Sequence, residues 1–212
     1  MNLSDIRKNI DATDQEIKTL LMRRMGYSHQ VAEAKLESGD TTIFRADREQ
    51  LILESLGSEV DDALKAEYLA VVRKIMEASR MYQYGLIFDW NPRVFQNVAG
   101  HELASTPGHM VRIRLSRADK PNAMSAILSM IGDYGYNMER MEPVNGVSLA
   151  MRDAGINGDK ADAGARVEGA DDSPTVSFEL TIRGNLAETS MQKLMFQLDG
   201  ECLAFEILEN LA

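Results

Sequence analysis

Residues 3–38 read LSDIRKNIDATDQEIKTLLMRRMGYSHQVAEAKLES, a stretch without proline that ends immediately before Gly39. Two apolar stripes run through it at heptad spacing: Leu3, Ile10, Ile17 and Val31 form one, and Ile6, Thr13, Leu20, Tyr27 and Ala34 form the other. Such stripes predict one long helix that packs along its whole length against partner helices. Asn2 or Ser4 can cap its start, and Gly39 can end it.

Arg24 interrupts the first stripe of this helix. A guanidinium on a buried seam is costly unless an anion neutralises it. At about 100° per residue, Ser28, Val31 and Lys35 fall on the same helix face as Arg24. Arg24 and Lys35 would therefore bracket a slot that suits a small dicarboxylate. From this helix alone, two ordinary basic residues that pair with acidic neighbours on a solvated face are an equally good interpretation.

The composition narrows the class of protein. The chain has 212 residues, enough for two modest domains, with 44% hydrophobic and 26% charged residues. A net charge of −10 disfavours nucleic acid as a partner. One cysteine and three scattered histidines have no metal-ligand spacing, so we expect no metal site. Without an apolar run for a leader or a membrane span, we expect a cytoplasmic protein that does not bind membranes.

Two shorter helices are predicted to follow, at about residues 46–56 with a break at Gly57, and at about residues 60–84 with Gly85 as the stop. Three helices, one of them about 50 Å long, cannot bury both stripes within one thin protomer. We therefore expect an all-α bundle in which a second copy of the chain supplies the missing surface, a homodimer.

From Met110 the apolar period changes from helical to two, as in Val111, Ile113 and Leu115. Strands are predicted at about 110–115, 137–144, 176–183 and 203–208, and helices at about 122–134 and 190–198. This βαββαβ order is that of an α+β ferredoxin-like domain, in which two helices cover one face of an antiparallel sheet. The predicted domains are 1–88 and 109–212, with a linker at 89–108 and a flexible, Gly-, Ala- and Asp-rich insertion at 145–173.

An ordered set of residues carries a family resemblance in the helical part: Leu3-Ser4-Asp5-Ile6-Arg7, Ile10-Asp11, Asp14, Arg24, Val31-Ala32, Lys35, Arg48-Glu49, Ser79 and Gln83. With these intervals, residues 3–84 resemble the all-helical chorismate mutase family. The resemblance implies an isomerase that rearranges chorismate to prephenate, a shikimate-pathway step in the biosynthesis of phenylalanine and tyrosine. The family reaction is a single pericyclic step that needs no nucleophile, metal or cofactor.

The resemblance also implies roles for single residues. Arg24 and Arg7 would bind the substrate carboxylates, Lys35 and Gln83 would donate to the ether oxygen, Glu49 would bond the ring hydroxyl, and Arg48 and Ser79 would complete the carboxylate pocket. Arg7 lies 17 residues before Arg24, about 25 Å along a straight helix, so it must come from the partner chain. Arg45 departs from the family, which often has an acidic residue there.

Residues 109–212 resemble an ACT regulatory domain, especially the one in bifunctional chorismate mutase–prephenate dehydratases. The segments that carry this likeness are Pro121-Asn122-Ala123-Met124 and Glu142-Pro143-Val144-Asn145. The likeness implies allosteric regulation by an amino-acid effector, with Asn122, Ala123, Met124 and Glu142 as its candidate site. No stretch between the two parts is long enough for a dehydratase domain.

Two other functions remain open at this stage. Isochorismate-pyruvate lyases share the helical fold, although Glu49 and Gln83 favour the mutase. Alternatively, the chain could be a non-catalytic, ligand-sensing partner of a shikimate-pathway enzyme. The whole set of cations argues against that alternative, because buried cations without an anionic ligand are destabilising.

Overall fold

The computed structural model describes residues 2–40, 42–97, 108–144 and 174–211. The chain divides into two compact units, Met1–Trp90 and Asn91–Ala212, which we describe separately. The insertion predicted at 145–173 lies outside the described residues, as does much of the predicted linker. No helix in the described part of the chain is long and apolar enough to cross a membrane.

The first unit begins with the long helix α1, which spans Leu3–Ser38 as predicted. Asn2 caps its start, because the side-chain oxygen accepts a hydrogen bond of 3.0 Å from the backbone N–H of Asp5. Gly39 closes its end at a φ of 72°, a left-handed conformation that glycine adopts without strain, and its N–H bonds the carbonyl of Leu36.

Helices α2 (Ala46–Ser58) and α3 (Lys65–Trp90) both run past the glycines at which we expected them to end. Gly57 is buried inside α2, and an added Cβ would lie 3.3 Å from a side-chain carbon of Leu69 on α3. Packing against α3 thus outweighs the helix-breaking tendency of this glycine. Helix α3 continues through Gly85 and ends two residues before Pro92, which disfavours helical backbone in the residue that precedes it.

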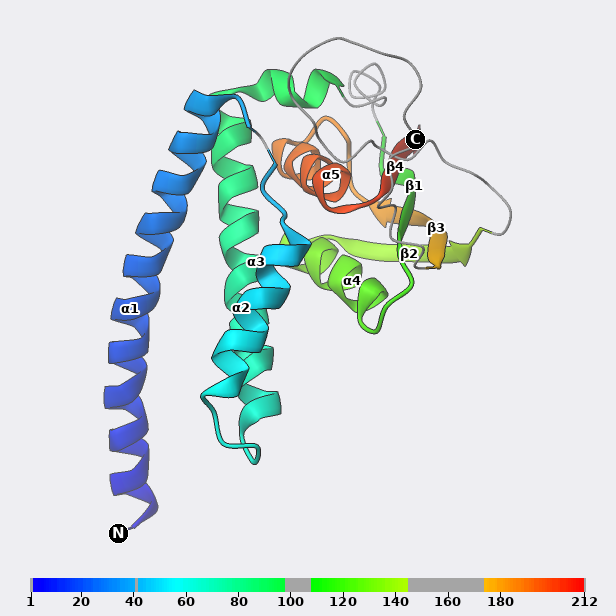
Figure 1. Ribbon diagram of the computed structural model, residues 1–212. Helices are drawn as coiled ribbons and strands as arrows, with labels where there is room; N and C mark the ends of the chain where they lie inside the picture. Colours follow the sequence, from blue (N-terminus) through cyan, green and yellow to red (C-terminus); the bar gives the residue numbers. More distant parts are fainter. Residues whose placement is uncertain (1, 41, 98–107, 145–173, 212) are drawn as a thin grey trace, which may run out of the picture. The chain divides into compact units, whose positions relative to one another are not determined.

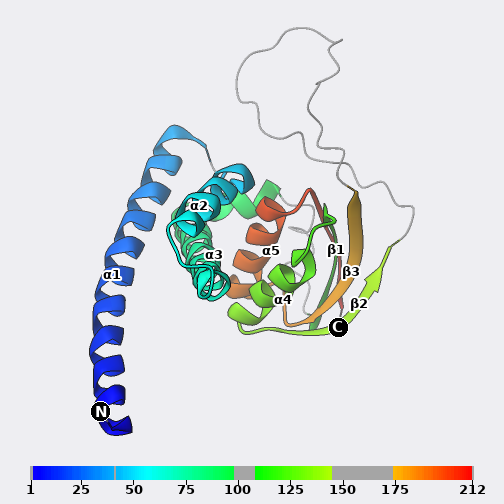
Figure 2. The ribbon, with the colours of Figure 1, turned by 60° about the horizontal axis from the view of Figure 1, so that its bottom comes forward.

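The C-terminal end of α1 lies close to α3, and the two helices diverge toward the N-terminus of α1 (Figures 1 and 2). Every residue from Asn2 to Leu20 is exposed. The exposed set includes both apolar stripes of this half: Leu3, Ile6, Ile10, Ile17 and Leu20. Only Ser28 and Ala32 of the helix are buried. The two apolar stripes predicted a helix packed along its whole length. Within the described chain, no other element buries these stripes between Asn2 and Leu20.

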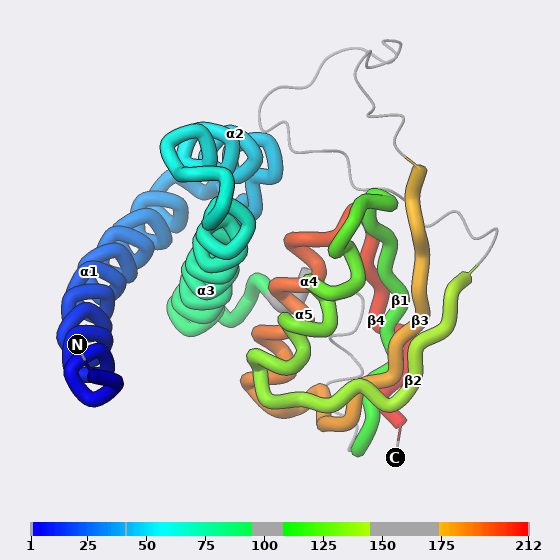
Figure 3. Tube along the Cα trace, turned by 90° about the horizontal axis from the view of Figure 1, so that it is seen from below, coloured from blue at the N-terminus to red at the C-terminus, as the bar shows by residue number. Residues whose placement is uncertain are grey.

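The second unit opens with a 3-10 helix, η1 (Pro92–Asn97). The remaining elements are β1 (Met110–Ala118), α4 (Ala123–Asp133), β2 (Asn137–Pro143), β3 (Thr175–Arg183), α5 (Thr189–Glu201) and β4 (Ala204–Leu211). The strands form one antiparallel sheet in the order β2-β3-β1-β4. Helices α4 and α5 lie side by side over one face of this sheet (Figure 3).

Alternation along β1 explains the two faces of the sheet. Val111, Ile113 and Leu115 are fully buried, whereas the alternate residue Arg114 pairs with Glu179 of β3, with 3.0 Å between Nε and Oε1. Successive side chains of a strand point to opposite faces, so one face packs on the helices and the other carries charge. The change to a period of two from Met110 is thus confirmed as a strand.

Replacing Gly184 with alanine is expected to destabilise the second unit by about 1–3 kcal/mol. Gly184 has a φ of 152°, and an added Cβ would lie 2.6 Å from Met191 Cε and 2.8 Å from Tyr136 Cε1. The Tyr136 ring cannot retreat easily, because its hydroxyl donates a 2.8 Å hydrogen bond to Glu188. Scanning calorimetry of the full chain should show one transition moved to lower temperature.

Gly132→Ala is the matched control for this substitution. Gly132 lies inside α4, and nothing stands within 4 Å of its added Cβ. Alanine there should stabilise the helix by about 0.5–1 kcal/mol. Equal transition temperatures for the two variants would contradict the packing argument.

Candidate active site

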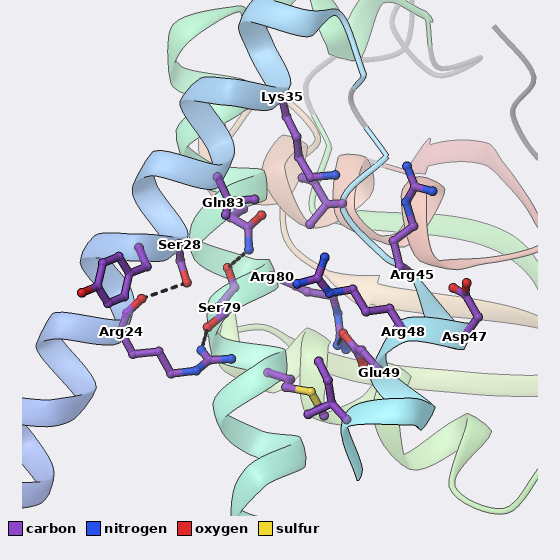
Figure 4. A pocket seen from close by; sticks show the side chains of 15 residues that line it. Arg24, Ser28, Lys35, Arg45, Asp47, Arg48, Glu49, Ser79, Arg80 and Gln83 are labelled. Atoms are coloured by element: carbon purple, nitrogen blue, oxygen red, sulfur yellow. Dashed lines mark hydrogen bonds and ion pairs between the residues drawn. The ribbon is translucent and has the colours of Figure 1, made fainter. Parts of the chain in front are cut away.

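A cavity of about 530 Å³ lies in the first unit, between α1, the start of α2 and α3 (Figure 4). Its lining is rich in charge and contains these residues: Arg24, Tyr27, Ser28, Val31, Lys35, Ile43, Arg45, Asp47, Arg48, Glu49, Ile52, Met76, Ser79, Arg80 and Gln83. Five of them are basic and two are acidic. A concave site with an excess of positive charge attracts anions.

The wall supplied by α1 consists of the helix face described above. Arg24, Ser28, Val31 and Lys35 all line the cavity, so the structure brings together the four residues that the helical wheel placed on one face. The hydroxyl of Ser28 donates to the backbone carbonyl of Arg24 at 3.3 Å. This internal bond keeps a small side chain between the two cations, which leaves room for a ligand.

Arg24 reaches across the cavity wall toward α3 (Figure 4). Its Nη1 donates to the hydroxyl of Ser79 and, at 3.5 Å, to the backbone carbonyl of Ile75. Burial lowers the pKa of Arg24 from its ordinary value, and the negative charge of Glu49 opposes this shift. A guanidinium keeps its charge in proteins despite such a shift. Arg24 is therefore a fixed, partly desolvated cation whose hydrogen-bond acceptors are neutral.

Lys35 enters the cavity from the C-terminal end of α1, and its Nζ donates to the backbone carbonyl of Thr42. Burial lowers the pKa of Lys35 most; Asp40 opposes that shift, and the nearby cations Arg45 and Arg48 add to it. The carbonyl that Lys35 contacts is neutral, so an anionic ligand would compete for this ammonium group effectively.

Asp40 holds the loop that follows α1. It accepts a 2.9 Å hydrogen bond from the backbone N–H of Thr42, which is the main reason why the pKa of its carboxyl is lowered. Its other oxygen lies 2.9 Å from Nη2 of Arg45. Arg45, the residue that departs from the family pattern, therefore lines the cavity while it is paired with Asp40.

Helix α3 supplies the opposite wall through Ser79 and Gln83, both of them buried. They stand one helical turn apart, and the amide nitrogen of Gln83 donates to the backbone carbonyl of Ser79 at 3.2 Å. A side-chain amide nitrogen carries two hydrogens, so one donor remains beyond this bond. The prediction that the two share one face of the third helix is confirmed.

Arg80 is a buried, charged cavity residue that sequence reasoning missed, as it also missed Asp47. Arg80 is buried, it lines the cavity, and its Nη1 forms an ion pair with Oε1 of Glu49 on α2. Its guanidinium also lies 5.0 Å from the ring centroid of Phe44. The sequence offered one sign of this role, because Arg80 lies three residues before Gln83 and therefore on the same helix face. Its partner Glu49 is 31 residues away, so no local sequence pattern indicates the ion pair.

Arg7 does not lie with the other predicted site residues. It is exposed on the N-terminal half of α1, and it is not among the residues that line the cavity. Arg24, Lys35, Arg48, Glu49, Ser79 and Gln83 all are. A role for Arg7 thus depends on a second copy of the chain.

The four candidate effector residues lie at two places in the second unit, three at the start of α4 and one on β2. Asn122 precedes α4 with a φ of 68°, and Ala123 and Met124 begin that helix. Glu142 lies on β2, is exposed, and pairs with Arg140 at 2.6 Å. A cavity of about 310 Å³ is lined by Glu142, but its lining includes none of the other three.

The chemistry of the larger cavity is that of donors and cations. Its lining contains no histidine and no cysteine. In the described ranges no three His, Cys, Asp or Glu side chains are grouped so that they could hold a metal ion. Such a site can hold a dianion in one conformation and stabilise negative charge that develops during a reaction.

Fold and cavity together define a helical domain with a cavity rich in basic side chains. Residues 6–84 match the family model described as chorismate mutase type II, so the first unit contains a chorismate mutase type II domain. This match supports chorismate mutase activity. A comparison with curated proteins finds no match. One solved structure, titled "GqqA- a novel type of quorum quenching acylases", is similar at 18% identity and a TM-score of 0.26, covering 49% of this chain and 44% of that chain. The present chain thus spans less than half the length of that protein.

Proposed function

We propose that the protein is a chorismate mutase that rearranges chorismate to prephenate in the biosynthesis of phenylalanine and tyrosine, in the cytoplasm. The observation that carries this proposal is the cavity in the family-matched domain, where Arg24, Lys35 and Gln83 converge from two helices. In this reaction an ether C–O bond breaks and a C–C bond forms within one molecule, without proton transfer. A charged cavity without a nucleophile–base pair in its lining suits that chemistry.

The cavity suggests a role for each wall. Arg24 would bind one substrate carboxylate, with Ser79 holding its guanidinium in place. Lys35 and Gln83 would donate to the ether oxygen, where negative charge grows as the bond breaks. Arg48 would complete the carboxylate pocket, and Glu49 would accept a hydrogen bond from the ring hydroxyl. Holding the flexible dianion in its reactive conformation supplies the remaining acceleration.

The decisive test is a spectrophotometric assay of chorismate loss combined with product analysis. Prephenate as the product supports the mutase. Salicylate and pyruvate formed from isochorismate would instead identify a lyase. No loss of chorismate above the uncatalysed rate would overturn the proposal and leave a non-catalytic sensing role.

The active site is proposed to be shared between two copies of the chain. Both apolar stripes of α1 are exposed between Asn2 and Leu20, and burial of a continuous apolar surface is the usual driving force for a stable dimer. Arg7 stands on the same exposed half. Packing α1 against a second copy would cover the stripes and could bring Arg7 into the other protomer's cavity.

The second unit is proposed to be a ferredoxin-like, ACT-like domain that regulates the mutase. Support comes from its β-α-β-β-α-β order, with two helices on one face of a sheet ordered β2-β3-β1-β4. An amino-acid effector would bind near Asn122, Ala123, Met124 and Glu142. Calorimetric titration with phenylalanine, tyrosine and tryptophan tests this, and the absence of binding for all three would remove the regulatory role.

A further inference from the structure

Arg80 contacts both Glu49 and the Phe44 ring within the proposed active site. Its side chain is 10% exposed, it pairs with a Glu49 side chain that is 23% exposed, and its guanidinium stands 5.0 Å from the centroid of the Phe44 ring. The pair connects α3 to α2 where both helices line the cavity. Figure 4 shows both side chains at the cavity edge, near Arg48.

Glu49 presents an electrostatic problem for the proposed substrate. The substrate carries two carboxylates, and a further carboxylate in the same cavity repels it. Charges of like sign a few ångströms apart in a partly desolvated site interact strongly, because little water screens them. Arg24 and Lys35 face neutral acceptors and can serve the substrate. Arg80 forms an ion pair directly with Glu49.

The ion pair also fixes what Glu49 can recognise. An ionised carboxylate only accepts hydrogen bonds, whereas a protonated one can also donate. With Arg80 beside it, Glu49 is held as an acceptor in one orientation. A ligand group that meets it must then be a donor, such as a hydroxyl. Sites built to bond a substrate hydroxyl reject analogues that lack it.

We propose that Arg80 is a positioning residue, which neutralises and orients Glu49 so that the cavity accepts a dianion and selects one that carries a ring hydroxyl. This inference rests on the proposed function, because it concerns the same cavity and the same substrate. The competing explanation is that the ion pair between Arg80 and Glu49 only links α2 to α3 and has no effect on the substrate. The two differ in what happens when the charge of Arg80 is removed and that of Glu49 is then removed as well.

Steady-state kinetics with chorismate on the full chain separates the two explanations. In Arg80→Met the side chain keeps most of its length but loses its charge, and KM should rise on the order of 100-fold, with a smaller fall in kcat. Arg80→Lys should recover at least a tenfold part of this loss. The double variant Glu49→Gln/Arg80→Met should have a lower KM than Arg80→Met, because the carboxylate that Arg80 neutralises in the parent is gone.

Inhibition by the chorismate analogue that lacks the ring hydroxyl tests the selectivity. The parent should bind this analogue more weakly than it binds chorismate, and the difference should shrink in Arg80→Met. Helical circular dichroism accompanies each measurement. If Arg80→Met does not fold, the comparison is made between Arg80→Lys and Phe44→Leu, of which Phe44→Leu removes the ring under the guanidinium and should raise KM several-fold.

The outcomes separate this inference from the function on which it rests. A parent that does not convert chorismate overturns the proposed function, and the role of Arg80 with it. An active parent beside a folded Arg80→Met with unchanged KM overturns the role of Arg80 alone. A double variant whose KM is no lower than that of Arg80→Met also overturns it.

Discussion

Lys35→Ala is expected to lower kcat/KM for chorismate by about 10²–10³-fold, while helical circular dichroism stays at the parent value. Lys35 is the cation of α1 that lines the cavity beyond Ser28 and Val31, and it contacts a neutral carbonyl in the loop after the helix. Its loss removes the charge that we propose to act on the ether oxygen. The fold should tolerate the change, because the side chain is only partly buried and alanine favours helix.

Gln83→Ala is expected to have a similar effect, since it removes the second donor that we propose for the same oxygen. Lys18→Ala is the matched control: Lys18 is an exposed lysine of the same helix and does not line the cavity. It should leave kcat/KM within a factor of about two, as expected for a surface change. Near-parent activity in both Lys35→Ala and Gln83→Ala would sink the assignment of the ether-oxygen donors.

The pH profile adds a readout for the charge on Lys35. Burial lowers the pKa of this ammonium from its ordinary value of 10.5, so the neutral amine forms at a lower pH than in free lysine. Its catalytic charge is present below that pKa and is lost as the pH rises through it. An alkaline fall in kcat/KM should therefore appear, because this ratio reports the free enzyme, and Lys35→Arg should remove the fall.

Features that depend on neighbouring residues were predictable from the sequence. Asn2, Gly39 and the heptad stripes define α1, and strict alternation defines β1, because each signal acts within a turn or a strand. The predicted end of α3 was wrong, since Gly85 weakens a helix only slightly whereas Pro92 disfavours helical backbone just before it. We took Gly85 as the stop of the helix, but Pro92, seven residues later, determines where the helix ends.

Features that depend on pairs far apart in the sequence were less accessible. The cavity residues could be assembled from the family resemblance, but Arg80 and its ion pair with Glu49 required the packing of α2 on α3. In the second unit, periodicity placed the elements without telling which surface residues converge. That is why Asn122 and Glu142 could be proposed together although Asn122 does not line the 310 Å³ cavity that Glu142 lines.

Arg7→Ala and Arg24→Ala are each expected to be inactive alone and to regain about a quarter of the parent activity when the two chains are mixed and refolded. Each proposed site takes Arg24 from one chain and Arg7 from the other. A mixed dimer therefore has one intact site and one site that carries both lesions. Random pairing makes half of the dimers mixed, and half of the sites in those dimers work.

The pair Arg24→Ala and Lys35→Ala serves as the matched control for mixing. Both residues line the cavity from the same helix of one chain, so every site of their mixed dimer keeps one lesion and should stay inactive. Recovery with the first pair but not the second requires Arg7 to act across the dimer. Arg7→Ala with full activity, or the absence of recovery in the first mixture, would contradict the shared site. The two exposed apolar stripes on the N-terminal half of α1 would then require an explanation other than a shared active site.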